Sequence, residues 1–182
     1  MKGNRAALAA IVAVVLLAAG WWIFRGSKPD EHVDFIALLP TAEKRPADHT
    51  FPVSDVTING ETHKAIEATP PTRLIWKVKI PQDAWLRVHV GMKPESFTAE
   101  GNGVLFFVRI SDGRSDDGLF EQYVNPFANP GERKWIPVMV DLSQYAGEEM
   151  QIIFNTRTSP PNSGDDNRND FAVWGAPEII TR

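Results

Sequence analysis

Apolar and polar residues alternate along most of the chain from residue 51 onward. Segment 73–80 reads RLIWKVKI, so that every second residue is apolar, and segment 85–90 repeats this alternation. Segment 103–110, which reads GVLFFVRI, is apolar on both faces for most of its length. A period of two predicts β-strands, and a strand with two apolar faces is typical of the middle of a sheet.

The remaining apolar runs predict further strands. They span residues 51–58, 62–68, 119–124, 134–142, 149–155 and 171–180. Asn59-Gly60 separates the first two runs and is a strong hairpin turn signal. About eight short antiparallel strands, joined by turns rich in Gly, Pro, Asn and Asp, predict an all-β fold. We expect an antiparallel β-sandwich of the jelly-roll type, with a closed barrel as the alternative.

A different pattern occupies the start of the chain. Residues 6–24 carry no charge, and as a helix they extend roughly 28 Å, close to the hydrocarbon thickness of a bilayer. This pattern predicts a single N-terminal transmembrane helix. Trp21, Trp22 and Phe24 lie at its end, where aromatic rings suit the headgroup interface. The alternative is a cleaved signal peptide, with Ala18-Ala19-Gly20 as the cleavage triplet.

The anchor sets the expected domain organisation. Residues 1–5 form a cytoplasmic tail, residues 25–50 a linker and membrane-proximal segment, and residues 51–182 the sandwich domain. Within the linker, residues 33–39 (VDFIALL) are interpreted as a short helical turn that Pro40 ends. A short tail before the helix and a long domain after it favour a single-pass protein of the inner (cytoplasmic) membrane, with its C-terminal domain in the periplasm or outside.

Composition removes several classes of function. The chain of 182 residues has no cysteine, which excludes disulfides, thiolate metal sites and cysteine nucleophiles. Its formal net charge of −4 argues against a nucleic-acid partner. No metalloprotease, serine-hydrolase or phosphate-loop motif is present in the sequence, so we expect a non-enzyme. The histidines have no metal-ligand spacing and are interpreted as surface residues. They are His32, His49, His63 and His89.

Two tryptophans are candidates for a ligand platform. Trp85 and Trp135 are out of phase with the inward residues of their strands, so they could be exposed, whereas Trp76 is in phase with the apolar face of its strand. An exposed aromatic ring can stack on a sugar ring. The alternative is that both tryptophans pack in the core or cover a sheet.

An acidic loop is a candidate metal site. Asp165, Asp166 and Asp170 offer the carboxylate oxygens that Ca²⁺ prefers, although the loop does not match the EF-hand pattern. The alternative is a solvated turn before the last strand. A structural Ca²⁺ ion is the cofactor that the sequence suggests, and otherwise no cofactor is expected.

The second half of the chain resembles a known family of domains. The matching segments are 101–106 (GNGVLF), 129–135 (NPGERKW), 140–147 (VDLSQYAG) and 170–177 (DFAVWGAP). They are similar to the carbohydrate-binding-module-like jelly-roll domains found beside bacterial sulfatases and in envelope proteins. The resemblance implies a jelly-roll fold and a glycan as candidate ligand. A catalytic domain, the usual companion of such domains, is not found in this sequence, and a membrane anchor precedes the domain instead.

These observations support two functions of different classes. The first is a non-catalytic accessory or interaction subunit of a membrane protein complex, of respiratory, photosynthetic or transport type. Its partners are then membrane lipid and an integral membrane protein. The alternative is a membrane-tethered carbohydrate-binding module with a glycan as ligand. A hydrolase, as a third function, requires two carboxylates, or a histidine and a carboxylate, that converge in a pocket.

Overall fold

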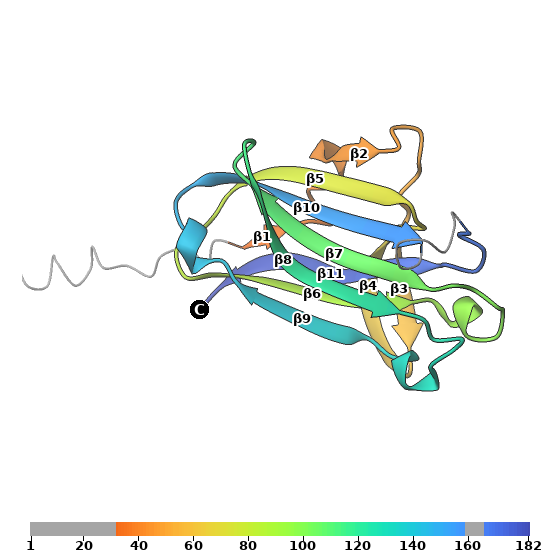
Figure 1. Ribbon diagram of the computed structural model, residues 1–182. Helices are drawn as coiled ribbons and strands as arrows, with labels where there is room; N and C mark the ends of the chain where they lie inside the picture. Colours follow the sequence, from red (N-terminus) through yellow and green to blue (C-terminus); the bar gives the residue numbers. More distant parts are fainter. Residues whose placement is uncertain (1–31, 159–165) are drawn as a thin grey trace, which may run out of the picture. The chain divides into compact units, whose positions relative to one another are not determined.

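The computed structural model describes residues 32–158 and 166–182. These residues form two antiparallel β-sheets that pack face to face (Figure 1). Each sheet turns an apolar face toward the other, so that stacking removes both faces from water. The fold is a β-sandwich, which confirms the predicted class.

The first sheet contains six strands. They are β1 (Val33–Asp34), β3 (Val53–Ile58), β4 (Glu61–Glu67), β6 (Ala84–Met92), β9 (Ile136–Asp141) and β11 (Ala172–Thr181). From one edge to the other, the strand order is β3–β4–β11–β6–β9, and β1 also pairs with β11. Strand β11 therefore lies in the middle of this sheet.

The second sheet contains five strands. They are β2 (Glu43–Arg45), β5 (Thr72–Lys79), β7 (Val104–Ser111), β8 (Asp116–Val124) and β10 (Glu149–Thr158). Their order is β2–β5–β10–β7–β8. Short 3-10 helices lie in the connections. They are η1 (Leu39–Thr41), η2 (Pro94–Phe97), η3 (Pro130–Glu132) and η4 (Ser143–Tyr145).

The predicted hairpin joins β3 and β4. Ile58 pairs with Glu61, and Asn59 and Gly60 between them have φ angles of 51° and 82°. A two-residue turn with positive φ at both positions is the type I′ turn, whose twist matches that of the flanking strands. The structure confirms the prediction from the Asn-Gly pair.

Large aromatic side chains fill the space between the sheets. Trp76 and Phe154 come from the second sheet and Trp174 from the first, and each is 1% exposed. Phe35 is fully buried, with its ring centroid 4.9 Å from that of Trp76. The indole Nε1 of Trp76 donates a hydrogen bond to the Leu38 carbonyl at 3.2 Å. The inward phase predicted for Trp76 is therefore confirmed.

The sandwich begins earlier than the sequence predicts. Val33 in β1 pairs with Ile179 in β11, and β2 pairs with β5. Residues 32–50, expected to be part of the linker, therefore contribute one short strand to each sheet. The expected helical turn at 33–39 is instead a short strand and a turn that leads into η1. Strands of two and three residues are too short to show a period-two pattern, which explains the difference.

The predicted membrane anchor, residues 6–24, lies outside the described residues, together with the tail 1–5. Its expected interface residues Trp21, Trp22 and Phe24 lie there too. In the part of the chain that the structure describes, no helix is long and apolar enough to cross a bilayer. Membrane anchoring thus stays a prediction from the sequence.

Candidate functional site

One row of polar and aromatic side chains crosses the outer face of the second sheet. Asn155 in β10 pairs with Arg73 in β5 and with Phe107 in β7, and Phe107 pairs with Glu121 in β8. Cross-strand partners point to the same side of a sheet. Their chain neighbours Leu74, Phe154 and Phe106 belong to the core, so this row lies on the outer face.

Guanidinium groups surround the aromatic ring in this row. The guanidinium carbon of Arg157 lies 4.8 Å from the centroid of Phe107, and that of Arg109 lies 5.7 Å away. Arg73 donates a hydrogen bond from Nε to Oδ1 of Asn155 at 2.7 Å. A stacked or hydrogen-bonded guanidinium loses part of its freedom, so its remaining N–H groups are held in place for a ligand.

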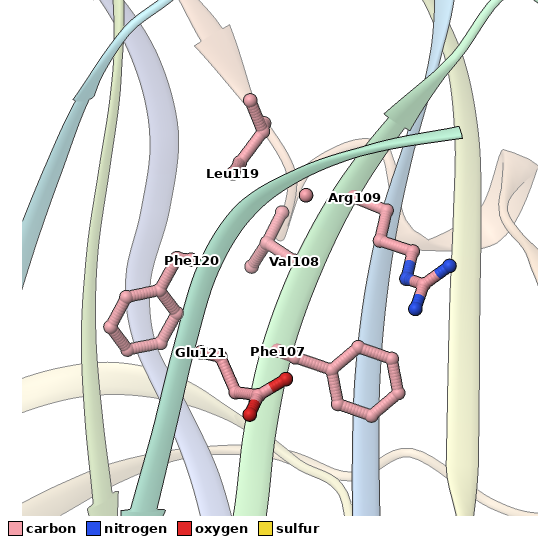
Figure 2. Close-up of a pocket in the computed structure, with 7 residues that line it drawn as sticks. Phe107, Val108, Arg109, Leu119, Phe120 and Glu121 are labelled. Carbon is pink, nitrogen blue, oxygen red and sulfur yellow. The ribbon is translucent and has the colours of Figure 1, made fainter. Parts of the chain in front are cut away.

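Two grooves flank the row. One is lined in part by Phe107 and Arg109 and has a volume of about 320 Å³ (Figure 2). The other is lined in part by Arg45, Arg73 and Arg157 and has a volume of about 390 Å³. We refer to the set that connects the two grooves as the arginine face. Its members are Arg45, Arg73, Arg109, Arg157, Phe107 and Asn155.

The arginine face carries positive charge that carboxylates only partly balance. Arg45 forms an ion pair with Glu43 at 2.5 Å, and Nη1 of Arg109 lies 4.0 Å from Asp116. A third carboxylate, that of Glu121, lines the groove beside Phe107. Arg73 and Arg157 form no ion pair with any residue in 32–158 or 166–182. Guanidinium forks match carboxylate, sulfate and paired hydroxyl oxygens, so this face suits a polar or acidic ligand.

The prediction that Trp135 forms part of an open platform is wrong. Trp135 is 3% exposed, and its indole Nε1 donates a hydrogen bond to the Glu61 carbonyl at 3.1 Å. Its ring lies over Gly91 and Gly175 on the outer face of the first sheet, where an added Cβ would come within 3.2 Å and 2.8 Å of ring carbons. Trp135 precedes β9, so strand periodicity does not describe its orientation.

Trp85 lies apart from Trp135. It is half-buried, and the guanidinium carbon of Arg182 lies 4.5 Å from its ring centroid. Trp135 covers Gly91, which lies about 20 Å from Trp85 along β6. The two tryptophans therefore share no platform. The aromatic residues that line the groove in Figure 2 are Phe107 and Phe120.

The structure gives the predicted calcium ligands that it describes two different environments. Asp165 lies outside the described residues. Asp166 accepts hydrogen bonds from Nε and Nη2 of Arg168 at 2.8 and 2.7 Å. These bonds lower the pKa of Asp166 to about 2. Asp166 is thus already engaged by a cation of the chain.

Asp170 has a different environment. It is 1% exposed, and neither carboxylate oxygen forms a hydrogen bond of good geometry with the described residues. Burial raises the pKa of Asp170 to about 7, the negative charge of Asp166 adds to this rise, and the backbone amide of Gly103 offsets it only in part. A buried carboxylate without a partner is neutral or binds a cation, so Asp170 stays a candidate Ca²⁺ ligand.

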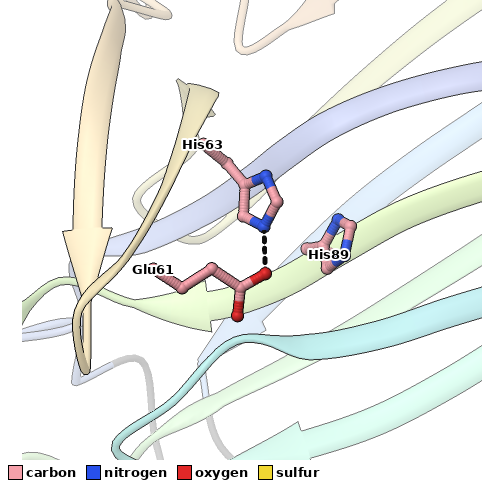
Figure 3. A group of neighbouring side chains, drawn as sticks. All are labelled: Glu61, His63 and His89. Atoms are coloured by element: carbon pink, nitrogen blue, oxygen red, sulfur yellow. Dashed lines mark hydrogen bonds and ion pairs between the residues drawn. The ribbon is translucent and has the colours of Figure 1, made fainter.

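The structure also brings together three side chains that sequence reasoning missed. Glu61 and His63 lie on β4 and His89 lies on β6 (Figure 3). Nε2 of His63 lies 2.7 Å from Oε1 of Glu61. The centroids of the His63 and His89 imidazole rings are 4.0 Å apart. Burial and the neighbouring His63 lower the pKa of His89. The i, i+2 spacing of Glu61 and His63 was the available signal, because it puts both on one face of a strand.

Comparison with known proteins gives one relative in sequence. No family model matches the chain. An uncharacterized protein of Archaeoglobus fulgidus is 43% identical over 104 residues, which cover 57% of this chain and 25% of that protein. The chain spans about a quarter of the length of the curated relative that it matches.

Solved structures share the fold at low sequence identity. CBM51 from Clostridium perfringens GH95, in complex with methyl-galactose, has a TM-score of 0.51 and 14% identity, over 76% of this chain and 91% of that chain. CBM51-2 of C. perfringens ZmpB, in complex with GlcNAc and with INT domains, has a TM-score of 0.53 and 15% identity, over 84% of this chain and 32% of that chain. The sandwich therefore has the jelly-roll fold of carbohydrate-binding modules, as the resemblance in the sequence implies.

Proposed function

We propose that the sandwich is a non-catalytic carbohydrate-binding module whose ligand is an acidic glycan, such as one with uronic acid or sulfated sugars. The arginine face carries this proposal. It places four guanidinium groups, an aromatic ring and a buried amide beside two grooves, in a fold shared with carbohydrate-binding modules. The acidic ligand follows from the local charge, because Arg73 and Arg157 have no carboxylate partner among the described residues.

Recognition at this face relies on hydrogen bonds and charge more than on stacking. Phe107 is 5% exposed and Arg157 covers its ring, so a sugar cannot lie on that ring unless Arg157 moves. The guanidinium groups can instead donate pairs of N–H bonds to a carboxylate or sulfate. Such binding weakens as the salt concentration rises, because exposed charges are screened.

The test is a glycan array with the full chain in mild detergent, followed by calorimetry on the glycans that bind. We expect acidic glycans to bind, and Arg73→Gln and Arg157→Gln to weaken binding by roughly tenfold or more, the value of a charged hydrogen bond. Lys77→Gln is the matched control, since Lys77 lies on the same sheet and pairs with Glu149 at 2.7 Å. Binding of neutral glycans alone, or an equal loss in the control, would contradict the proposal.

We also propose that residues 6–24 tether the module to the inner membrane, with the module in the periplasm or outside. The uncharged run of these residues supports this. We expect the protein to stay in the membrane pellet after alkaline carbonate extraction, and a variant without residues 6–24 to be released. Release of the unaltered chain would contradict the tether.

An accessory role in a membrane complex is compatible with such a tether. A helix without ionisable groups can pack against other membrane helices, and the module then stays near the bilayer. If this is its role, the protein extracted in mild detergent from its native membrane migrates in fixed stoichiometry with an integral membrane protein. Migration as a monomer without a partner would contradict the accessory role, and glycan binding would then be the one proposed function that remains.

A further inference from the structure

We propose that Glu61, His63 and His89 bind one divalent transition-metal ion of the zinc class. The site lies on the outer face of the first sheet, and it is independent of the arginine face on the second sheet. Imidazole nitrogen and carboxylate oxygen are ligands that Zn²⁺ takes from proteins, and two histidines with one carboxylate form a known zinc donor set.

The strand order creates this group. Strand β11 lies between β4 and β6, and Gly175 pairs with Ala65 on one side and with His89 on the other. Alternate strands of a sheet lie about 10 Å apart, too far for side chains to meet easily over a large neighbour. Because Gly175 has no side chain, the Cβ of His63 can approach it closely, and the imidazoles of His63 and His89 meet with centroids 4.0 Å apart.

The donor atoms are close enough to share an ion after small rotations. One ligand atom from each of the three residues lies within 4.8 Å of the others. Around a zinc ion at 2.0–2.2 Å, donor atoms lie roughly 3–3.5 Å apart. The imidazole planes are now stacked at 21°, so at least one ring must turn about its Cβ–Cγ bond for both nitrogens to face one ion.

The surroundings hold the ligands in place. Trp135 meets the His63 ring edge-on, with centroids 5.2 Å apart, and its indole N–H binds the Glu61 carbonyl at 3.1 Å. These contacts fix the main chain at Glu61 and restrict the ring of His63. Nδ1 of His89 is buried and forms no hydrogen bond of good geometry with the described residues, and the backbone of Gly175 is only a weak partner for the ring. A buried nitrogen of this kind calls for a partner, and a bound metal supplies it if the ring turns.

Charge and access also favour a bound cation. Glu61 supplies a negative charge, and its side chain is 55% exposed, so an ion can enter from solvent. Arg87 on the same strand as His89 opposes a cation, but it donates a hydrogen bond to Glu178 at 2.7 Å. Three protein ligands leave at least one coordination position for water or for a donor atom of another molecule.

Calorimetry on the full chain in mild detergent tests this site. The protein is made without a polyhistidine tag and stripped of metal with a chelator. We expect one equivalent of Zn²⁺ to bind, and an excess of Ca²⁺ or Mg²⁺, which prefer oxygen ligands, should not displace it. Co²⁺ in the same site should give the visible absorption of a low-coordinate nitrogen and oxygen site.

The variants His63→Gln, His89→Gln and Glu61→Gln should each weaken Zn²⁺ binding by roughly tenfold or more and abolish the Co²⁺ absorption. His32→Gln is the matched control, because His32 also pairs with a carboxylate, that of Glu178. Equal affinity in the unaltered chain and the site variants, or no Zn²⁺ binding at all, would overturn the proposal. If a histidine variant fails to fold, Glu61→Gln decides, since that side chain is exposed.

Discussion

At the scale of single residues, the carboxyl groups of Asp166 and Asp170 have different environments and opposite pKa shifts, although both belong to one loop. Asp166 is bound by Arg168, which keeps its pKa near 2. Asp170 is buried among groups that give it no hydrogen bond of good geometry, and its pKa rises to about 7. The two residues look alike in the sequence, because neither burial nor the position of Arg168 is visible there.

The raised pKa of Asp170 makes stability depend on pH. The folded state holds the proton more tightly than the unfolded state, whose pKa is near the ordinary 3.8. The resulting stabilisation is full below about pH 4 and is lost as the pH rises to about 7, which amounts to roughly 4 kcal/mol at most. Asp170→Asn keeps the shape without the charge, so we expect a higher melting temperature than the unaltered chain at pH 8.

The control for this prediction is Asp166→Asn, which should give a much smaller gain in melting temperature at pH 8. It removes a carboxylate that already has a partner in Arg168, and the charge of Asp166 is the smallest cause of the raised pKa of Asp170. Thermal unfolding of the three proteins at pH 5 and pH 8 measures the difference. A melting temperature of Asp170→Asn below that of the unaltered chain at pH 8 would mean that the carboxylate has a stabilising partner.

That partner would be the predicted calcium ion. If Ca²⁺ binds at Asp170, adding it at pH 8 should raise the melting temperature of the unaltered chain, and EDTA should reverse the rise, since a ligand that binds the folded state stabilises it. Asp170→Asn should respond much less. If Ca²⁺ changes the melting temperature of neither protein, the calcium prediction is wrong.

At the scale of strands, two glycines allow a second, smaller core on the outer face of the first sheet. Trp135 lies across Gly91 in β6 and Gly175 in β11, and it packs with Ile58 and Val173. The outer face of such an antiparallel sheet is commonly exposed to water, but here an indole ring covers part of it. It also places the ring beside the histidines of the proposed metal site.

Gly175→Ala should destabilise the sandwich by about 1–3 kcal/mol, the usual effect of overpacking. The added Cβ would lie 2.8 Å from one carbon of the Trp135 ring, and that ring is held by its hydrogen bond. Chemical unfolding followed by tryptophan fluorescence measures the change. Gly118→Ala is the control, because no atom lies within 4 Å of its added Cβ, and equal stability of the two variants would contradict the steric argument.

Much of the strand content could be predicted from the sequence, because alternation reports which face of a strand is buried. Strands β5 and β6 and the hairpin before them follow from that pattern. The sites could not be predicted, since they depend on which strands are neighbours. Arg157 meets Phe107, and His63 meets His89, across strand pairs that are distant in the sequence.

At the scale of the whole molecule, β11 connects the first sheet. It pairs with β1, β4 and β6, so it joins segments from the start and the middle of the described chain. Trp174 within it also reaches the core, where its ring centroid lies 4.7 Å from that of Phe154 in the second sheet. Removing β11 would leave the first sheet in separate pieces.

Deletion of residues 172–182 should therefore abolish cooperative unfolding, because the backbone groups of β4 and β6 lose their partners and the core loses Trp174. Circular dichroism during heating measures this. Arg182→Gln is the control, since it removes the guanidinium group over Trp85 and leaves β11 complete. A sharp thermal transition in the truncated chain would show that the remaining strands form a sheet without β11.

The central place of β11 also bears on how the chain reaches its fold in time. Ala172 pairs with Met92, so a long loop must close before this strand gains its contacts, and such topologies fold in milliseconds to seconds. During that interval β4 and β6 border an open slot one strand wide, which a strand from another chain can enter. The lifetime of this slot, more than the stability of the finished sandwich, then determines how much of the protein aggregates during refolding.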